Sequence, residues 1–167
     1  EESHPGELHR LVDSPRDVPT YDLKPEMSAP AAAGAFVEGW SGGGYGFGII
    51  NFANPDMVGH TGVIPAAVAA IEAVDAQLGR IVAAVEAGGG ALVVTADHGN
   101  ADHMLEPDGS PNTAHSLSPV PLIVTADGAA PLRDGGILAD VAPTVLELLG
   151  VTQPDEMTGT SLLPAGS

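Results

Sequence analysis

The sequence predicts an α/β fold with a mostly parallel, doubly wound sheet. Short apolar runs alternate with longer amphipathic segments along the chain, as in proteins where helices cover a parallel sheet. The residues are 44% hydrophobic with only 4% aromatic, so the apolar content is mainly aliphatic, while 22 Gly and 15 Pro indicate many loops. A length of 167 residues suits one domain with a sizeable core, and we expect a single domain over 1–167.

The first elements follow from turn residues and apolar runs. Residues 25–40, PEMSAPAAAGAFVEGW, predict a helix with Pro30 in its first turn, where proline is tolerated, and the run Ser41-Gly42-Gly43-Gly44 ends it. Residues 47–52, FGIINF, form a nearly continuous apolar run between turn residues, which predicts a strand buried on both faces. We expect the loop ANPDMVGHTG, 53–62, to follow it.

The rest of the chain repeats this alternation. Residues 63–90 carry apolar side chains at three- and four-residue spacing and end in three glycines, which predicts an amphipathic helix with a glycine stop. Residues 91–95, ALVVT, predict a second buried strand, 100–118 a long polar loop, 120–125 a third strand and 138–149 a last helix. In such sheets, ligands bind where strands end and loops begin.

The charge excludes some functions. The chain has 22 Asp and Glu against 5 Lys and Arg, a formal net charge of −17, so a nucleic-acid or anionic-membrane surface is disfavoured. We hypothesise adaptation to high salt, which screens the self-repulsion of such a surface; circular dichroism against KCl concentration tests it.

There is no Cys, no apolar run as long as a membrane span and no secretory signal pattern, so a cytoplasmic protein is expected. The absence of an initiator Met leads us to expect that the chain begins partway through a longer protein.

An acidic residue and a histidine follow directly on the second predicted strand. Asp97 and His98 would project into the ligand crevice at the strand's carboxyl end, and Gly99 would let the backbone turn beside them. An Asp-His pair after a strand can equally cap a helix or bond a turn. From these residues alone the two interpretations carry equal weight.

A similar pair follows the first predicted strand. Asp56 and His60 are four residues apart, so one helical turn or tight loop would present an oxygen and a nitrogen to the same cation. The alternative is a helix N-terminal Asp with a surface His, but both pairs should open on the same edge of the sheet. His115 stands in a polar loop, where a lone His is more often exposed than a ligand.

These five side chains suit hard or borderline divalent cations. Two Asp and three His without Cys fit Mn²⁺, Mg²⁺ or Zn²⁺, and the imidazoles favour manganese or zinc. Five ligands exceed what one catalytic cation usually takes and are too few for two complete shells. The set therefore predicts that further ligands come from elsewhere.

Several segments in unbroken order carry a family resemblance. The segments are TYDLKPEMSA (20–29), NFANPDMVGHTG (51–62), AIEAVDAQLG (70–79), VTADHGNAD (94–102), TAHSLSPVPLI (113–123), LRDGGILADVAPTVLELLG (132–150) and EMTGTSL (156–162). Together they resemble the cofactor-independent phosphoglycerate mutases, which belong to the alkaline-phosphatase-like metalloenzymes. Asp-His-Gly alone is typical of the wider superfamily, whereas the longer motifs point to this family.

The resemblance implies a role for each ligand. Asp56, His60 and His115 would bind one metal, and Asp97 with His98 a second, most often Mn²⁺, with Mg²⁺, Zn²⁺ or Co²⁺ as alternatives. In the family a metal-activated Ser takes the phosphoryl group of 3-phosphoglycerate and returns it to the 2-hydroxyl, in glycolysis and gluconeogenesis. In the family this Ser and an Asp, both from an N-terminal segment, also hold the second metal. No position here matches either residue, and no segment here resembles the family's transferase domain.

What remains resembles the C-terminal portion of a split phosphatase domain with an incomplete core. We therefore expect a fragment that is inactive alone, whose small-molecule substrate would be phosphoglycerate, with no nucleic-acid or membrane partner; full-length family enzymes are expected to be monomeric. Where the family has Ser-Pro-Lys, this chain has Ser14-Pro15-Arg16, so Arg16 is a candidate phosphate ligand of altered geometry. Thr160 similarly replaces a common Lys.

Two other functions stay open at this point. One is a different alkaline-phosphatase-like hydrolase or mutase with the same Asp and His pattern, and the other is a non-catalytic metal-binding remnant. His4, His9 and His103 match no ligand position and are interpreted as exposed or locally bonded.

Overall fold

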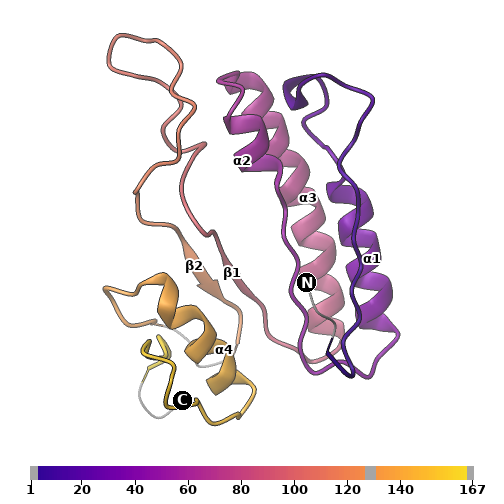
Figure 1. Cartoon of the computed structure of the whole chain (residues 1–167). Coiled ribbons are helices and arrows are strands. Elements are labelled where there is room, and N and C mark those ends of the chain that lie inside the picture. Colours follow the sequence, from indigo (N-terminus) through magenta and orange to yellow (C-terminus); the bar gives the residue numbers. More distant parts are fainter. Residues whose placement is uncertain (1–3, 127–130, 165–167) are drawn as a thin grey trace. The chain divides into compact units, whose positions relative to one another are not determined.

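The computed structural model describes residues 4–126 and 131–164, which group into two compact units (Figure 1). The helical unit comprises residues 1–84 and 98–118, and the strand unit comprises 85–97 and 119–167. The prediction of a single domain over 1–167 stays a prediction. No helix in the described parts of the chain is long and apolar enough to cross a bilayer.

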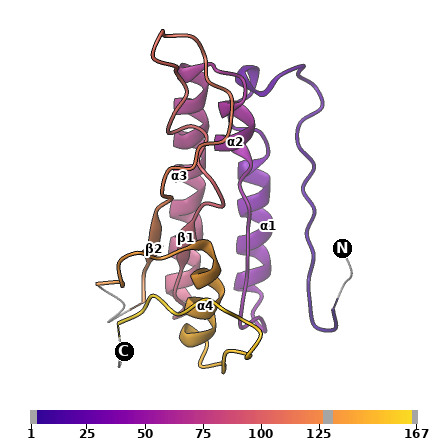
Figure 2. The same ribbon diagram turned by 60° about the vertical axis from the view of Figure 1, so that its left-hand side comes forward.

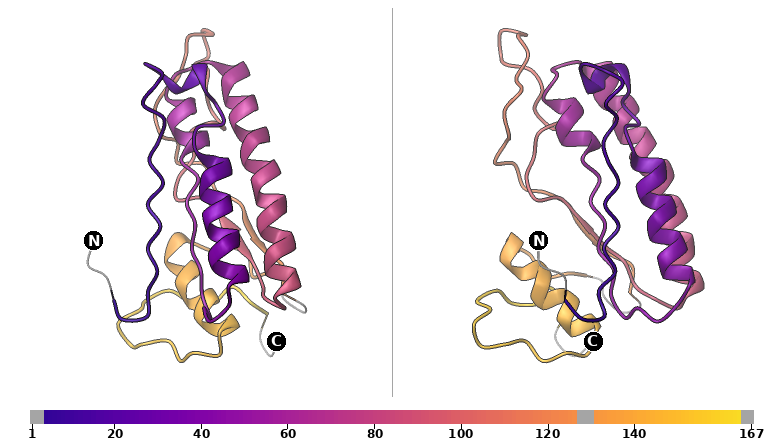
Figure 3. Two further views of the ribbon diagram at one scale, coloured as in Figure 1. Left: turned by 90° about the vertical axis from the view of Figure 1, so that its right-hand side faces the viewer. Right: turned by 45° about the vertical axis from the view of Figure 1, so that its right-hand side comes forward.

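The helical unit contains a short 3₁₀ helix η1 (Tyr21–Leu23) and three α-helices, α1 (Ala29–Ser41), α2 (Asn54–Gly59) and α3 (Ile64–Ala87), the last of which runs on into the strand unit. Pro30 lies in the first turn of α1, as predicted. The helices α1 and α3 lie side by side in every view (Figure 3), and Arg80 of α3 reaches the Pro30 carbonyl of α1.

One apolar cluster places α2 within this unit. It consists of buried Met27, Val58, Ala66, Ala67, Ala70 and Met104, with Tyr21 and Ala101 packed against it. Val58 is fully buried and comes from α2, the alanines come from α3, and Met104 comes from the loop that follows His98. Burial of these side chains therefore fixes α2 between α3 and the 98–118 segment.

The strand unit contains β1 (Val93–Thr95), β2 (Leu122–Val124), a 3₁₀ helix η2 (Leu138–Asp140) and α4 (Val141–Leu148) (Figure 2). These elements lie within or close to the ranges predicted from the sequence. The two strands pair antiparallel, Val93 opposite Val124 and Thr95 opposite Leu122, so parallel pairing does not hold for this pair. Between them the chain makes the 98–118 excursion without a crossover helix, which a parallel pair would need.

The predicted strand at 47–52 is wrong. The structure assigns no strand there, and Ile49 is 84% exposed rather than buried on both faces. A strand requires a hydrogen-bonded neighbour, and no segment in the described ranges is paired with it. The next residues, predicted as loop, instead contain the short helix α2.

Candidate metal centre

The helix α2 positions Asp56 and His60. It begins at Asn54 with Pro55 in its first turn, where a missing N–H costs nothing, and it ends at Gly59. The backbone N–H of His60 donates to the Asp56 carbonyl at 3.0 Å, so the two side chains stand one turn apart on the same side of the helix. The spacing predicted from the sequence is thus realised on a single helical turn.

The 98–118 segment positions His98 and His115 opposite each other. Gly99 and Ser116 form an antiparallel bridge, and the Ser116 N–H donates to the Gly99 carbonyl at 2.8 Å. A Cβ at position 99 would lie 2.1 Å from Ser116 Oγ and 2.4 Å from Asp102 Oδ1, so only glycine allows this close approach. Each histidine is the immediate chain neighbour of a bridged residue, and the bridge therefore brings both imidazoles together.

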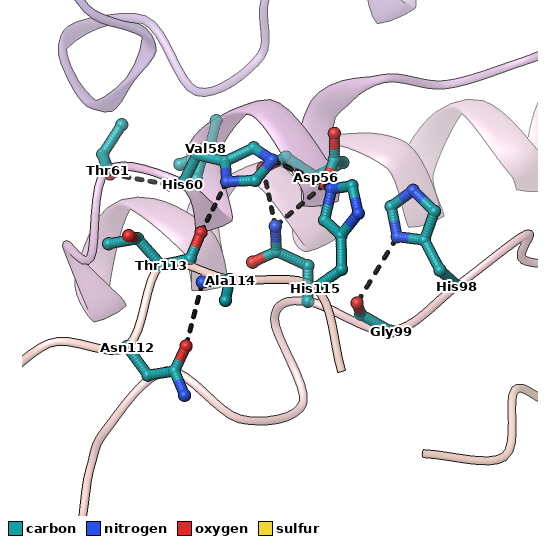
Figure 4. A network of polar contacts seen from close by, with 11 residues as sticks. Asp56, Val58, His60, Thr61, His98, Gly99, Asn112, Thr113, Ala114 and His115 are labelled. Atoms are coloured by element: carbon teal, nitrogen blue, oxygen red, sulfur yellow. Dashed lines mark hydrogen bonds and ion pairs between the residues drawn. The ribbon is translucent and has the colours of Figure 1, made fainter. Parts of the chain in front are cut away.

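Three atoms that could bind a metal lie close together beside α2 (Figure 4). Asp56 Oδ1 lies 3.2 Å from His60 Nε2 and 3.1 Å from His115 Nε2, and the two nitrogens are 3.1 Å apart. Ligands bound to one cation at about 2.1 Å and at right angles to each other are separated by about 3.0 Å. The triangle thus has the dimensions of one face of a cation's coordination shell.

The hydrogen bond on the far side of His60 supports the same interpretation. His60 Nδ1 lies 2.6 Å from the Thr113 carbonyl, which can only accept, so Nδ1 carries the proton and neutral His60 has its lone pair on Nε2. Metal-bound histidines usually donate their other N–H to a carbonyl or carboxylate in this way. The lone pairs of His60 and Asp56 then face each other, and one positive ion between the three atoms would satisfy all of them.

His98 belongs to the same cluster. Its ring stacks on that of His115 with centroids 3.8 Å apart and an interplanar angle of 21° (Figure 4). Ligand atoms of Asp56, His98 and His115 all lie within 4.8 Å of one another. Four of the five ligands predicted from the sequence are therefore gathered in the helical unit.

Asp97 and Arg16 stay predictions. Asp97 follows β1 and precedes His98 in the chain, and it belongs to the strand unit, whereas the four gathered side chains belong to the helical unit. Arg16 is 85% exposed and pairs with Asp13 at 3.3 Å. Of the other histidines, His4 and His103 are exposed, and His9 forms an ion pair with Glu7.

A clamp between Asp102 and Ser116 supports the loop that carries His115. Ser116 Oγ lies 2.9 Å from each oxygen of Asp102 and donates to that carboxylate. Hydrogen bonds from Ser118 and then Ser116 lower the pKa of Asp102 below its ordinary value. The carboxylate is therefore held in its ionised form, which keeps the clamp closed.

Three groups that support the cluster were not predicted from the sequence, namely Asn100, Asp102 and the Thr113 carbonyl. Asn100 Nδ2 donates to Asp56 Oδ1 at 2.9 Å, so it contacts the carboxylate of the cluster directly. Asn100 and Asp102 stand within the VTADHGNAD motif, which was the available signal for them. A backbone carbonyl such as that of Thr113 leaves no signature in side-chain chemistry.

Asp and His side chains that converge in this way are typical of metal-binding proteins. The comparison with protein families is more specific. Residues 1–153 match the profile of the Metalloenzyme superfamily, so the chain belongs to that superfamily.

Curated relatives and a solved structure carry a common name. The chain is 58% identical over 164 residues to a 2,3-bisphosphoglycerate-independent phosphoglycerate mutase of Nitratidesulfovibrio vulgaris, covering 98% of this chain and 32% of that protein. It is also 58% identical to the protein of that name in Thermomicrobium roseum, covering 33% of it. The structure resembles Leishmania mexicana phosphoglycerate mutase, crystallised at low cobalt concentration, with a TM-score of 0.81 and 36% identity over 92% of this chain and 31% of that one.

These matches confirm the resemblance to cofactor-independent phosphoglycerate mutases and the α/β class with an incomplete core. The chain spans about a third of the length of the relatives that it matches.

Proposed function

We propose that this chain forms part of a metal-dependent phosphoglycerate mutase that interconverts 3-phosphoglycerate and 2-phosphoglycerate, an isomerase of glycolysis and gluconeogenesis in the cytoplasm. The observation that carries the proposal is the triangle formed by Asp56 Oδ1, His60 Nε2 and His115 Nε2, with all three separations at 3.1–3.2 Å. The relatives that carry this activity in their names support the substrate.

Each ligand predicted from the sequence has a proposed task. Asp56, His60 and His115 hold one divalent cation, and Asp97 with His98 holds a second. Two carboxylates and three imidazoles suit manganese or zinc, and the family resemblance favours Mn²⁺, with Mg²⁺, Zn²⁺ or Co²⁺ as alternatives. Bound cations would neutralise charge on a phosphoryl group and lower the pKa of a serine hydroxyl.

The nucleophile of the complete enzyme is a proposed serine that accepts the phosphoryl group and returns it. By family resemblance that serine would belong to an N-terminal segment, and no position of this chain matches its motif. We therefore expect the 167-residue chain alone to show no mutase turnover, and Arg16 to contribute to phosphate binding only within the complete enzyme.

Calorimetric titration with Mn²⁺ tests the metal centre. The chain should bind Mn²⁺, and Asp56→Asn should abolish the strongest binding event because it removes the anionic ligand. A chain that is folded by circular dichroism but binds no Mn²⁺ would reject the centre.

A chimeric enzyme tests the reaction. This chain replaces the matching third of the Nitratidesulfovibrio vulgaris enzyme, and conversion of 3-phosphoglycerate is followed by a coupled assay with Mn²⁺. Turnover that disappears in the Asp56→Asn chimera supports the proposal. A folded chimera that binds Mn²⁺ but does not turn over would instead favour another reaction of the superfamily.

A further inference from the structure

We infer that Asn100 is a positioning residue that holds the Asp56 carboxylate in place for cation binding, an inference that rests on the proposed metal centre. Asn100 is only 5% exposed, although its side chain is polar. Its Nδ2 donates to Asp56 Oδ1 at 2.9 Å, and a longer contact of 3.4 Å reaches the Asp56 carbonyl. One amide thus holds both the side chain and the backbone of this residue.

The bond falls on the oxygen that faces the imidazoles. Asp56 Oδ1 is the same atom that lies 3.2 Å from His60 Nε2 and 3.1 Å from His115 Nε2. A lysine or arginine at position 100 would also orient this oxygen, but its charge would compete with a cation. The neutral amide of Asn100 orients the carboxylate and leaves its negative charge available.

The other end of the Asn100 amide is unusual. Its Oδ1 is buried and has no hydrogen-bond partner, which is uncommon in folded proteins and calls for an explanation. Turning the amide over would direct its oxygen at the Asp56 carboxylate and oppose two acceptors. The unpartnered Oδ1 lowers stability, but this orientation of the amide lets Nδ2 donate to Asp56.

Gly59 makes room for this arrangement. A Cβ at position 59 would lie 2.3 Å from Asn100 Oδ1 and 2.9 Å from its Cγ, so any side chain there would displace the amide. Gly59 is buried on α2, between Asp56 and His60. Glycine at position 59 and asparagine at position 100 are therefore both needed for the same contact.

Asn100 also connects the two parts of the cluster. It lies two residues after His98, in the turn that the Gly99–Ser116 bridge fastens to the His115 loop. Its bond to Asp56 joins this turn to α2. We therefore assign Asn100 the role of keeping the carboxylate in register with both histidines.

The test measures Co²⁺ and Mn²⁺ affinity, together with the visible absorption of bound Co²⁺, for the unchanged chain and three variants. Asn100→Ala and Gly59→Ala should each weaken metal binding about 10- to 100-fold, as expected for loss of an outer-shell partner. Both should alter the Co²⁺ spectrum, because the carboxylate is no longer oriented. Thr144→Ala is the matched control, since it truncates a fully buried, hydrogen-bonded side chain of the strand unit and should lower stability without changing metal affinity.

The double variant provides a sharper criterion. If Gly59 acts through Asn100, then Gly59→Ala should change affinity by less than about twofold once Asn100 is alanine. Asn100→Ser replaces Asn100→Ala if the alanine variant does not fold. A folded Asn100 variant that binds metal within about twofold of the unchanged chain overturns the inference, whereas failure of the unchanged chain to bind metal rejects the centre itself.

Discussion

Asp56 and Asp140 carry the same side chain in opposite surroundings. Asp140 in the strand unit is 8% exposed, and its two oxygens accept backbone N–H groups from Thr160 at 2.7 Å and Ile137 at 2.9 Å. Asp56 in the helical unit receives one amide N–H and faces two imidazole nitrogens. Two backbone N–H donors satisfy the Asp140 carboxylate, whereas the Asp56 carboxylate has one amide donor and the lone pair of His60 Nε2 beside it.

This difference separates a structural carboxylate from a candidate ligand. The protein satisfies Asp140, whose bond to the Thr160 N–H fastens the segment around Thr160 to the start of α4. Arg133 donates to the carbonyl of Ser161 in that same segment. A cation bound between Asp56 Oδ1, His60 Nε2 and His115 Nε2 would contact all three atoms. The number of N–H donors around a carboxylate thus distinguishes a structural Asp from a candidate metal ligand better than its burial does.

The largest expected effect is the loss of Mn²⁺ affinity when Asp56, rather than Asp140, is replaced by alanine. Asp56→Ala is expected to weaken Mn²⁺ binding by more than about 100-fold, since even an outer-shell partner is worth 10- to 100-fold. Asp140→Ala should leave Mn²⁺ affinity unchanged and lower the melting temperature. Calorimetry and thermal denaturation of both variants measure this, and a loss of affinity in Asp140→Ala would break the distinction.

A histidine pair sharpens the comparison within the helical unit. His60→Ala should weaken Mn²⁺ binding by about 100-fold, because it removes a proposed direct ligand, while His103→Ala, at an exposed position, should have no effect. Both variants carry the same loss of an imidazole. Equal losses of affinity would show that total histidine content, rather than the triangle, determines binding.

Thr144→Ala examines the strand unit alone. Thr144 Oγ1 donates to the Asp140 carbonyl at 2.7 Å and accepts from the Leu162 N–H at 2.9 Å, and the side chain is fully buried. Leaving that N–H unsatisfied should cost about 1–3 kcal/mol of unfolding free energy. Urea denaturation measures it, and an unchanged midpoint would show that this contact contributes nothing.

The smallest expected effect is a loss of stability of the strand unit at acid pH, caused by protonation of Asp140. Backbone hydrogen bonds from Thr160 and then Ile137 lower the pKa of Asp140 from its ordinary value of 3.8. A lowered folded-state pKa means that the stabilisation is complete above the ordinary value and is lost as pH falls through the folded value. Asp140→Asn should therefore reduce the acid sensitivity of unfolding below about pH 4; an identical pH profile in the variant would contradict this.

The sequence predicted the long helix α3 and the strand β1 well because their patterns are local. Apolar residues repeat with helical period before the three glycines that follow α3, and a short apolar run precedes Asp97. The prediction of a strand at 47–52 was wrong because a strand needs a neighbouring segment to pair with, and an apolar run does not specify that segment. The helix α2 was predicted as a loop because six residues are too few to show a period.

For the site, residue types and order were sufficient to select the candidate ligands Asp56, His60, Asp97, His98 and His115 and the kind of cation they suit. Only the folded chain decided that His115, a lone histidine in a polar loop, lies 3.1 Å from Asp56, and that Asn100 orients that carboxylate. The physical reason is that ligand chemistry is a property of each side chain. Convergence depends on contacts between segments about fifty residues apart, and only packing brings those together.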